Sequence, residues 1–214
     1  MGAEKLTGKD IRTSGDDMHM EHLTTDRWDE TLWAEADVIY REAFPEHGRK
    51  SEAIVRRMFE RGLCTLHVWR MDGEAAAMAL TAFDDRSGLL VIDYIAVRRS
   101  RQGQGIGRRC VLQLRDWIAG AKPGCRGIVI EVEAEETEEN AGRIRFWESA
   151  GFRLTEYVHV YIWVPETYRA MSLGFDASSP LTDDGKELFK AITRYHERAY
   201  RRTKGSGSGD GGKV

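Results

Sequence analysis

The feature that most constrains the fold is a glycine-rich loop that follows a long apolar segment. Residues Leu89 to Val97 are apolar except for Asp93 and Tyr94, which predicts a central strand buried on both faces. The sequence Gln102-Gly103-Gln104-Gly105-Ile106-Gly107 comes shortly after it. The next residues form the apolar face of a predicted helix: Ile106, Cys110, Leu114, Trp117 and Ile118. A strand, a loop and a helix in this order, within further strands and helices, predict an α/β (α+β) domain.

The rest of the chain also alternates between the two kinds of element. Helices are expected near 27–42, 51–62, 140–150 and 182–202, and strands near 64–71, 75–83, 127–134 and 152–164. Residues 1–18 are polar and 205–214 are rich in glycine and serine, so both ends are expected to be flexible. This organisation predicts a main domain over 19–175 and a helical extension over 176–204.

The glycine-rich loop has the properties of an anion site. Glycine has no Cβ, so successive backbone N–H groups can turn toward one point and approach an anion closely. The helix that begins near Gly105 adds the positive end of its dipole. Arginines flank the loop on both sides: Arg98, Arg99, Arg101, Arg108 and Arg109. Together these features predict a site for a pyrophosphate or a phosphate ester.

Two familiar phosphate loops do not fit this sequence. A P-loop requires Lys and then Ser or Thr after its last glycine, whereas Gly107 is followed by Arg108. A dinucleotide fingerprint requires its third glycine at position 108, which is again the arginine. A glycine-rich turn that binds no ligand remains an alternative.

A second motif narrows the choice. Residues Asn140 to Phe152 read NAGRIRFWESAGF, in which Asn opens a predicted helix and Gly-Phe begins the next strand. This segment, and the Gln/Arg-x-x-Gly-x-Gly/Ala pattern of the loop, resemble the two signatures of the GNAT superfamily of acyl-CoA-dependent N-acyltransferases. The resemblance covers about Trp28 to Val164, and its two motifs occur in the expected order and context.

The resemblance implies a fold and a co-substrate. The expected GNAT fold has a central mixed, mostly antiparallel sheet that is splayed between the fourth and fifth strands, with helices on both faces and here an extra C-terminal helix. Acetyl-CoA, or another acyl-CoA, would bind there as co-substrate, with no metal. The implied contacts are backbone groups near Ile95, Ala96 and Val97, the loop residues Gln102, Gly103, Gln104, Gly105, Ile106, Gly107 and Arg108, and then Asn140 and Trp147.

Direct transfer to a primary amine in a ternary complex requires a base. An amine with a pKa of ~10.4 is almost fully protonated at pH 7, and its neutral form costs ~4.6 kcal/mol. A carboxylate can remove this proton directly or through water. Glu131 is the first candidate, because several family members carry their base at this position; Glu133 and Asp93 follow. The alternative is that these are solvated or salt-bridged carboxylates without a catalytic role.

The sequence departs from the family where the general acid is usually found. Trp147 occupies the helix position that usually holds a tyrosine, and indole has no useful acidity. Three explanations remain open for protonation of the leaving thiolate. Tyr157, His159 or Tyr161 could supply the proton, water could supply it, or no acid is needed. A thiol of pKa ~8.5 can leave as thiolate near pH 7 at a penalty of only ~2 kcal/mol.

The acceptor is less defined than the donor. Glutamates crowd the region before the predicted helix at Asn140: Glu131, Glu133, Glu135, Glu136, Glu138 and Glu139. A solvated acidic loop is the simpler interpretation, and a cationic small-molecule or peptide amine is the alternative. Two other functions stay open. One is an acyl-CoA-binding module without turnover, and the other is transfer of longer acyl chains onto a peptide or small-molecule amine.

Composition excludes several classes. The net charge of −3 gives no indication of nucleic-acid binding. No segment approaches the ~18 apolar residues of a membrane helix, and the polar start of the chain does not resemble a secretory signal. The odd number of cysteines, three, fits neither a disulfide framework nor a zinc site. We therefore expect a cytoplasmic protein, monomeric or homodimeric, without a metal.

Overall fold

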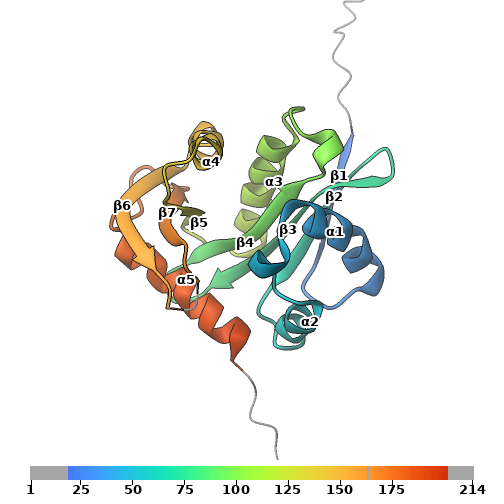
Figure 1. Cartoon of the computed structure of the whole chain (residues 1–214), viewed down its shortest axis with the longest axis horizontal. Coiled ribbons are helices and arrows are strands. Elements are labelled where there is room, and N and C mark those ends of the chain that lie inside the picture. The colour runs from blue at the N-terminus through green and yellow to red at the C-terminus, as the bar shows by residue number, and fades with distance from the viewer. Residues whose placement is uncertain (1–18, 163, 202–214) are drawn as a thin grey trace, which may run out of the picture.

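The computed structural model describes residues 19–162 and 164–201, which form one mixed sheet with helices on both faces (Figure 1). The strands are β1 (Met20–Thr25), β2 (Thr65–Met71), β3 (Glu74–Asp84), β4 (Leu89–Val97), β5 (Gly127–Glu133), β6 (Arg153–Val160) and β7 (Thr167–Gly174). Their order is β1-β2-β3-β4-β5-β7-β6, and among these described strands only β4 and β5 pair in parallel. Residues 1–18 and 205–214, which were expected to be flexible, lie outside the described residues.

The helices divide between the two faces of the sheet. They are α1 (Glu30–Ala43), α2 (Glu52–Glu60), α3 (Ile106–Ala121), α4 (Glu138–Ser149) and α5 (Gly185–Tyr200), with short 3₁₀ turns η1 (Glu46–Gly48) and η2 (Arg99–Arg101). Side chains of α1, α2 and α5 share one hydrophobic core, and those of α3 and α4 share another. The predicted fold class is therefore confirmed, including the extra C-terminal helix. Among the described residues, no helix is both long and apolar enough to cross a bilayer.

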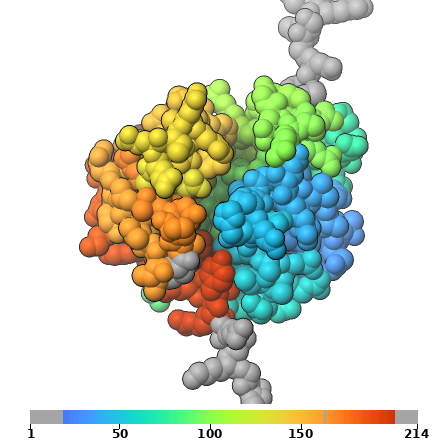
Figure 2. Space-filling view, viewed as in Figure 1, coloured from blue at the N-terminus to red at the C-terminus, as the bar shows by residue number. Residues whose placement is uncertain are grey.

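The sheet splays between β4 and β5, as expected. The two strands pair only from Leu89 with Gly127 to Val91 with Val129. Beyond these residues β5 continues to pair with β7 as far as Glu133, while β4 continues to pair with β3 as far as Val97. The surface is hollowed between the yellow-to-orange part of the chain and the green-to-blue part (Figure 2). We call this hollow the β4–β5 groove.

A β-bulge interrupts β4 at the start of this splayed region. Leu80 of β3 pairs with Tyr94, but the next residue, Thr81, pairs with Ile92, so Asp93 is an extra residue in β4. A bulge changes the direction of the side chains that follow it. As a result, Asp93 and Tyr94 both contact groups on the α1 and α5 side of the sheet.

Three details of the fold differ from the sequence-based expectations. Strands β1 and β7 were not predicted, because one is a half-exposed edge strand with polar residues and the other directly follows the irregular residues 164–166, which include Pro165. The strand expected over 152–164 ends as β6 at Val160, and residue 163 lies outside the described residues. Helix α4 begins at Glu138, two residues before Asn140, because the Thr137 hydroxyl caps it by accepting from the Asn140 amide at 3.1 Å.

Candidate active site

The loop between β4 and α3 has a backbone conformation that suits glycine at two of its positions. Gly103 and Gly105 have φ values of 76° and 74°, in the left-handed region that favours glycine. A Cβ at either position would meet nothing within 4 Å, so the backbone conformation, rather than space, requires glycine there. Gly105 is the N-cap of α3, and none of the described side chains caps this helix end. The first amides of α3 therefore remain available to an anion at the loop.

Gly107 serves a different purpose from the other two glycines. A Cβ at Gly107 would lie 3.2 Å from Cε2 and Cζ of Phe146 and 3.6 Å from Cγ2 of Val97. The residue thus allows α3 to approach the Phe146 ring of α4 closely. Gln102 secures the other end of the loop, since its Nε2 donates to the Val97 carbonyl at 3.1 Å.

Three of the arginines around the loop have partners among the described residues. Arg98 and Arg101 form ion pairs, each with an N–O distance of 3.4 Å, with Glu74 and Asp72 near the β2–β3 turn. Arg99 donates to the Glu42 carbonyl of α1. Arg108 lies in the first turn of α3 and is exposed.

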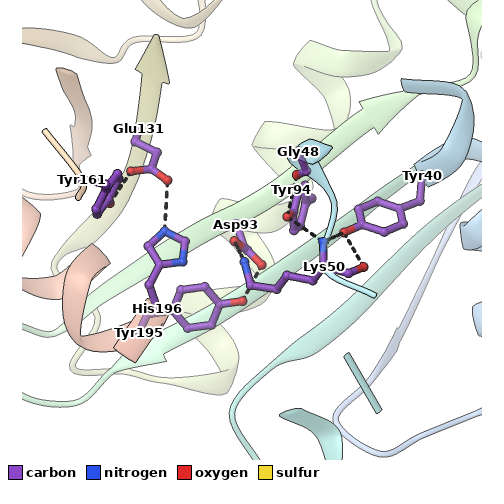
Figure 3. Close-up of polar contacts among 9 residues, drawn as sticks. All are labelled: Tyr40, Gly48, Lys50, Asp93, Tyr94, Glu131, Tyr161, Tyr195 and His196. Atoms are coloured by element: carbon purple, nitrogen blue, oxygen red, sulfur yellow. Dashed lines mark hydrogen bonds and ion pairs between the residues drawn. The ribbon is translucent and has the colours of Figure 1, made fainter. Parts of the chain in front are cut away.

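Two carboxylates lie at matching positions on either side of the β4–β5 groove. The last pair between the strands joins Val91 to Val129, and Asp93 and Glu131 each follow it by two residues. Asp93 contacts Tyr195 of α5, and Glu131 contacts the next residue of that helix, His196, as Figure 3 shows. A carboxylate therefore lies on each of the two strands close to where they separate.

Glu131 is held by two donors and remains partly accessible. The Tyr161 hydroxyl donates to its Oε2 at 2.7 Å, and Nε2 of His196 lies 3.0 Å from its Oε1. The Glu131 side chain is 22% exposed. Burial, together with the charge of Glu131, raises the pKa of Tyr161 well above its usual value. Tyr161 therefore remains a protonated donor throughout the neutral range.

Asp93 is sealed in the protein. Its Oδ1 lies 2.8 Å from Nζ of Lys50, and its Oδ2 accepts from the Tyr195 hydroxyl at 2.5 Å. The side chains of Lys50 and Asp93 are 2% and 3% exposed. The Lys50 ammonium also lies over the rings of Tyr94 and Tyr195, at 4.9 and 5.4 Å from their centroids. Asp93 is thus a buried, salt-bridged carboxylate.

Comparison with known proteins identifies the family of this α/β domain. Residues 26–152, more than half of the chain, match the Acetyltransferase (GNAT) family. The chain belongs to this family. A search of curated proteins found no match.

Solved structures agree in fold with this GNAT chain. A GNAT-family protein from Bacteroides thetaiotaomicron is 20% identical with a TM-score of 0.66, covering 86% of this chain and 99% of that one. The ribosomal-protein-S18-alanine N-acetyltransferase from Escherichia coli is 22% identical with a TM-score of 0.51, covering 76% and 99%. An acetyltransferase from Bacillus subtilis, in complex with CoA, is 17% identical with a TM-score of 0.52, covering 74% and 100%. At these identities the likeness establishes the fold alone.

The second GNAT motif is partly structural in this chain. Asn140 is buried; its Nδ2 donates to the Glu135 carbonyl at 3.1 Å, and its Oδ1 accepts from Arg143 at 3.2 Å, so it holds the turn before α4. Trp147 lies in the core and packs edge-on against Phe146 and Phe152. Contacts of Asn140 and Trp147 with the co-substrate stay predictions.

The remaining predicted carboxylate and three unpredicted residues complete the description. The Glu133 side chain is 40% exposed and lies 3.6 Å from Nη1 of Arg143. Lys50, Tyr195 and His196 contact the two groove carboxylates but were not predicted as site residues. Tyr195 carried only the signal of an apolar helix face, and nothing in the sequence connected Lys50 or His196 with strands far along the chain.

Proposed function

We propose that this GNAT protein transfers an acetyl group from acetyl-CoA to a primary amine, by direct transfer in a ternary complex. The observation that carries the proposal is the uncapped start of α3 behind two left-handed glycines, at the edge of a groove that holds an accessible carboxylate. Family membership supports the acetyl donor, and a protein of the same fold from Bacillus subtilis is in complex with CoA.

The loop and β4 would bind the co-substrate, which supplies the acetyl group as an activated thioester. Amides at Gly103, Gly105 and the first turn of α3 would bind its diphosphate, as helix N-termini do in other phosphate sites. The backbone of Ile95 to Val97 lies beyond the last β4–β5 pair, so its edge toward β5 is available to the pantetheine amides. A backbone N–H on this edge could donate to the thioester carbonyl oxygen.

Glu131 would accept the proton of the acceptor amine. Its partial exposure in the groove makes it reachable, whereas Asp93 is sealed and salt-bridged. Tyr161 contacts Oε2 of Glu131, and His196 contacts Oε1. Each oxygen keeps a second lone pair that can accept from the amine or from a bridging water. The base must offset the ~4.6 kcal/mol cost of neutralising an amine of pKa ~10.4 at pH 7.

We infer that the thiolate leaves without a dedicated acid. Trp147 has no acidic proton and is packed in the core. Tyr161 donates to Glu131, and its raised pKa makes it a weak acid. Departure of the free thiolate near pH 7 costs only ~2 kcal/mol, which is small beside the cost of deprotonating the amine.

The first experiment measures acetyl-CoA binding by calorimetry in a matched pair of glycine variants. Gly105→Glu places a negative charge at the loop, and Gly62→Glu places the same residue at another left-handed glycine, after α2, where a Cβ also meets nothing within 4 Å. Both variants carry a similar backbone strain and the same added charge, so a difference between them reports the presence of the carboxylate at the loop. We expect at least a tenfold loss of affinity in Gly105→Glu and a change below about twofold in Gly62→Glu.

The second experiment measures thiol release from acetyl-CoA with spermidine, Nα-acetyl-lysine, glucosamine and a lysine-containing peptide. Turnover with an amine supports the enzymatic proposal. Tight acetyl-CoA binding without thiol release in the presence of any acceptor would instead favour the binding module. The replacement of the usual tyrosine by Trp147 is consistent with that alternative. Unchanged affinity in Gly105→Glu would contradict the loop assignment itself.

A further inference from the structure

Helix α5 lies outside the family match at residues 26–152, yet it contacts both groove carboxylates. Tyr195 donates to Asp93 of β4, and the next residue, His196, contacts Glu131 of β5. Consecutive side chains on a helix point about 100° apart, so one turn of α5 reaches both strands where they have separated. Figure 3 shows the two rings side by side on α5, each directed at its own carboxylate.

The contact between His196 and Glu131 fixes the orientation of the carboxylate. Oε1 faces Nε2 of His196, and Oε2 faces the hydroxyl of Tyr161, which follows β6. Donors from two separate elements thus hold the two oxygens of one carboxylate. The His196 side chain is only 13% exposed, and its ring packs near those of Tyr161 and Tyr195, at 5.9 and 5.2 Å between centroids. The imidazole therefore has little freedom to turn away.

We propose that His196 is a positioning residue of the active site, and that its Nε2–H holds Glu131 in the orientation needed to receive the amine proton. This inference rests on the proposed role of Glu131 as the base. A misplaced base loses rate steeply, because proton transfer requires hydrogen-bond distance to the reacting group. By this inference, α5 completes a site whose loop and strands belong to the family fold.

Two substitutions that differ by one methylene test the inference. In His196→Gln, the side-chain amide NH₂ can reach about the position of Nε2, whereas in His196→Asn it reaches only about the position of Nδ1. Both variants are uncharged and polar. The measurements are kcat and KM for thiol release with the best amine of the panel, the dissociation constant for acetyl-CoA, and the melting temperature.

We expect kcat to fall about 10- to 100-fold in His196→Asn and to stay within about threefold of the wild type in His196→Gln. The dissociation constant for acetyl-CoA should change by less than about twofold in both. In a Glu131→Gln background, His196→Asn should cause no further loss, because no base is left to position. Lys190→Ala, at an exposed position of the same helix, serves as the control for handling and expression.

The possible failures are distinguishable. Equal loss of kcat in both His196 variants, together with a lower melting temperature, would indicate a merely structural contact and overturn the inference. Wild-type kcat in His196→Asn, with an inactive Glu131→Gln, would overturn the inference and leave the proposed function standing. Wild-type kcat in Glu131→Gln would contradict the assignment of Glu131 as the base. An absence of thiol release by the wild type would contradict the enzymatic proposal. Either outcome also overturns the role of His196.

Discussion

Asp93 and Glu131 occupy matching positions on the two strands of the groove, but their surroundings differ. Asp93 is 3% exposed, pairs with the Lys50 ammonium and accepts from Tyr195. Glu131 is 22% exposed, and its partners are a hydroxyl and an imidazole. A carboxylate that is neutralised and enclosed contributes to the structure, whereas one that is oriented and reachable can exchange a proton with a ligand. The same residue type in the same place can therefore serve two purposes, depending on its partners.

The largest expected effect comes from removing the carboxylate of Glu131. Glu131→Gln keeps the size of the side chain but cannot accept a proton, so kcat for thiol release should fall about 10²- to 10⁴-fold. The melting temperature should change little, because the residue is partly exposed. Glu133→Gln, two residues along β5 and 40% exposed, is the matched control and should change kcat less than about threefold. If Glu133→Gln caused the larger loss, the two strand carboxylates would have to exchange roles.

Removing the partner of Asp93 should mainly affect stability. Lys50→Met leaves a buried carboxylate without its counter-ion, which costs about 3 to 5 kcal/mol of unfolding free energy. Chemical denaturation would measure this loss directly. The double variant Lys50→Met with Asp93→Leu removes both charges and should recover most of the stability. A stability close to wild type in Lys50→Met alone would show that Asp93 does not depend on the pair.

Tyr195→Phe distinguishes the contact of α5 with Asp93 from its contact with Glu131. It removes the hydrogen bond to Asp93 but leaves the Lys50 pair and the His196 contact, so about 1.5 to 3 kcal/mol of unfolding free energy should be lost. The kcat of the folded protein should stay within about threefold, in contrast to His196→Asn. A loss of kcat in Tyr195→Phe as large as that in His196→Asn would instead make Asp93 part of the chemistry.

The smallest effect concerns pH and a histidine pair on the opposite face of the sheet. His22 Nε2 lies 3.1 Å from Nδ1 of His67, and Nε2 of His67 lies 2.9 Å from the hydroxyl of Thr81, at the bulge that contains Asp93. Burial lowers the pKa of His22 to about 4, and that of His67 well below its usual value. Below pH 6.5 the unfolded chain binds protons that the folded chain does not, so stability falls as the pH drops from 6.5 toward 4.

For His22, which is half-buried, this loss should reach about 1 kcal/mol at pH 5 after its partial exposure is taken into account. His22→Gln preserves a donor toward His67 and should narrow the difference in melting temperature between pH 7.5 and pH 5. An unchanged difference would assign the acid sensitivity to His67 or to other groups. The catalytic comparison between the two groove carboxylates should be unaffected by this substitution.

The sequence predicted the parts of the molecule whose signals are local. The strand over the apolar segment 89–97, the helix that follows the glycine loop and the splay implied by the family resemblance all agree with the structure. The charge of Asp93 within an apolar strand was visible in the sequence, but its explanation was not, because it depends on a bulge and on Lys50, which lies 43 residues away.

The parts that escaped prediction depend on distant contacts. The core packing of Trp147 was not predicted, since a pattern of aromatic residues does not reveal which face of a helix meets the sheet, and its contact with the co-substrate stays a prediction. His196 lies 65 residues from Glu131, and only the docking of α5 brings the two together. Strands β1 and β7 were missed because their partners, rather than their own composition, stabilise them.

The extra residue in β4 also affects how the chain tolerates changes in length. Side chains alternate along a strand, so deleting one residue at the bulge would restore regular alternation and reverse the facing of Ile95, Ala96 and Val97. Val97 would then lose its place beside Gly107, and the turn that follows would start with its amides rotated toward the wrong side of the sheet. In a library of variants, substitutions near position 93 should therefore be tolerated more often than deletion of one residue there, because the extra residue sets the facing of every residue that follows it in β4.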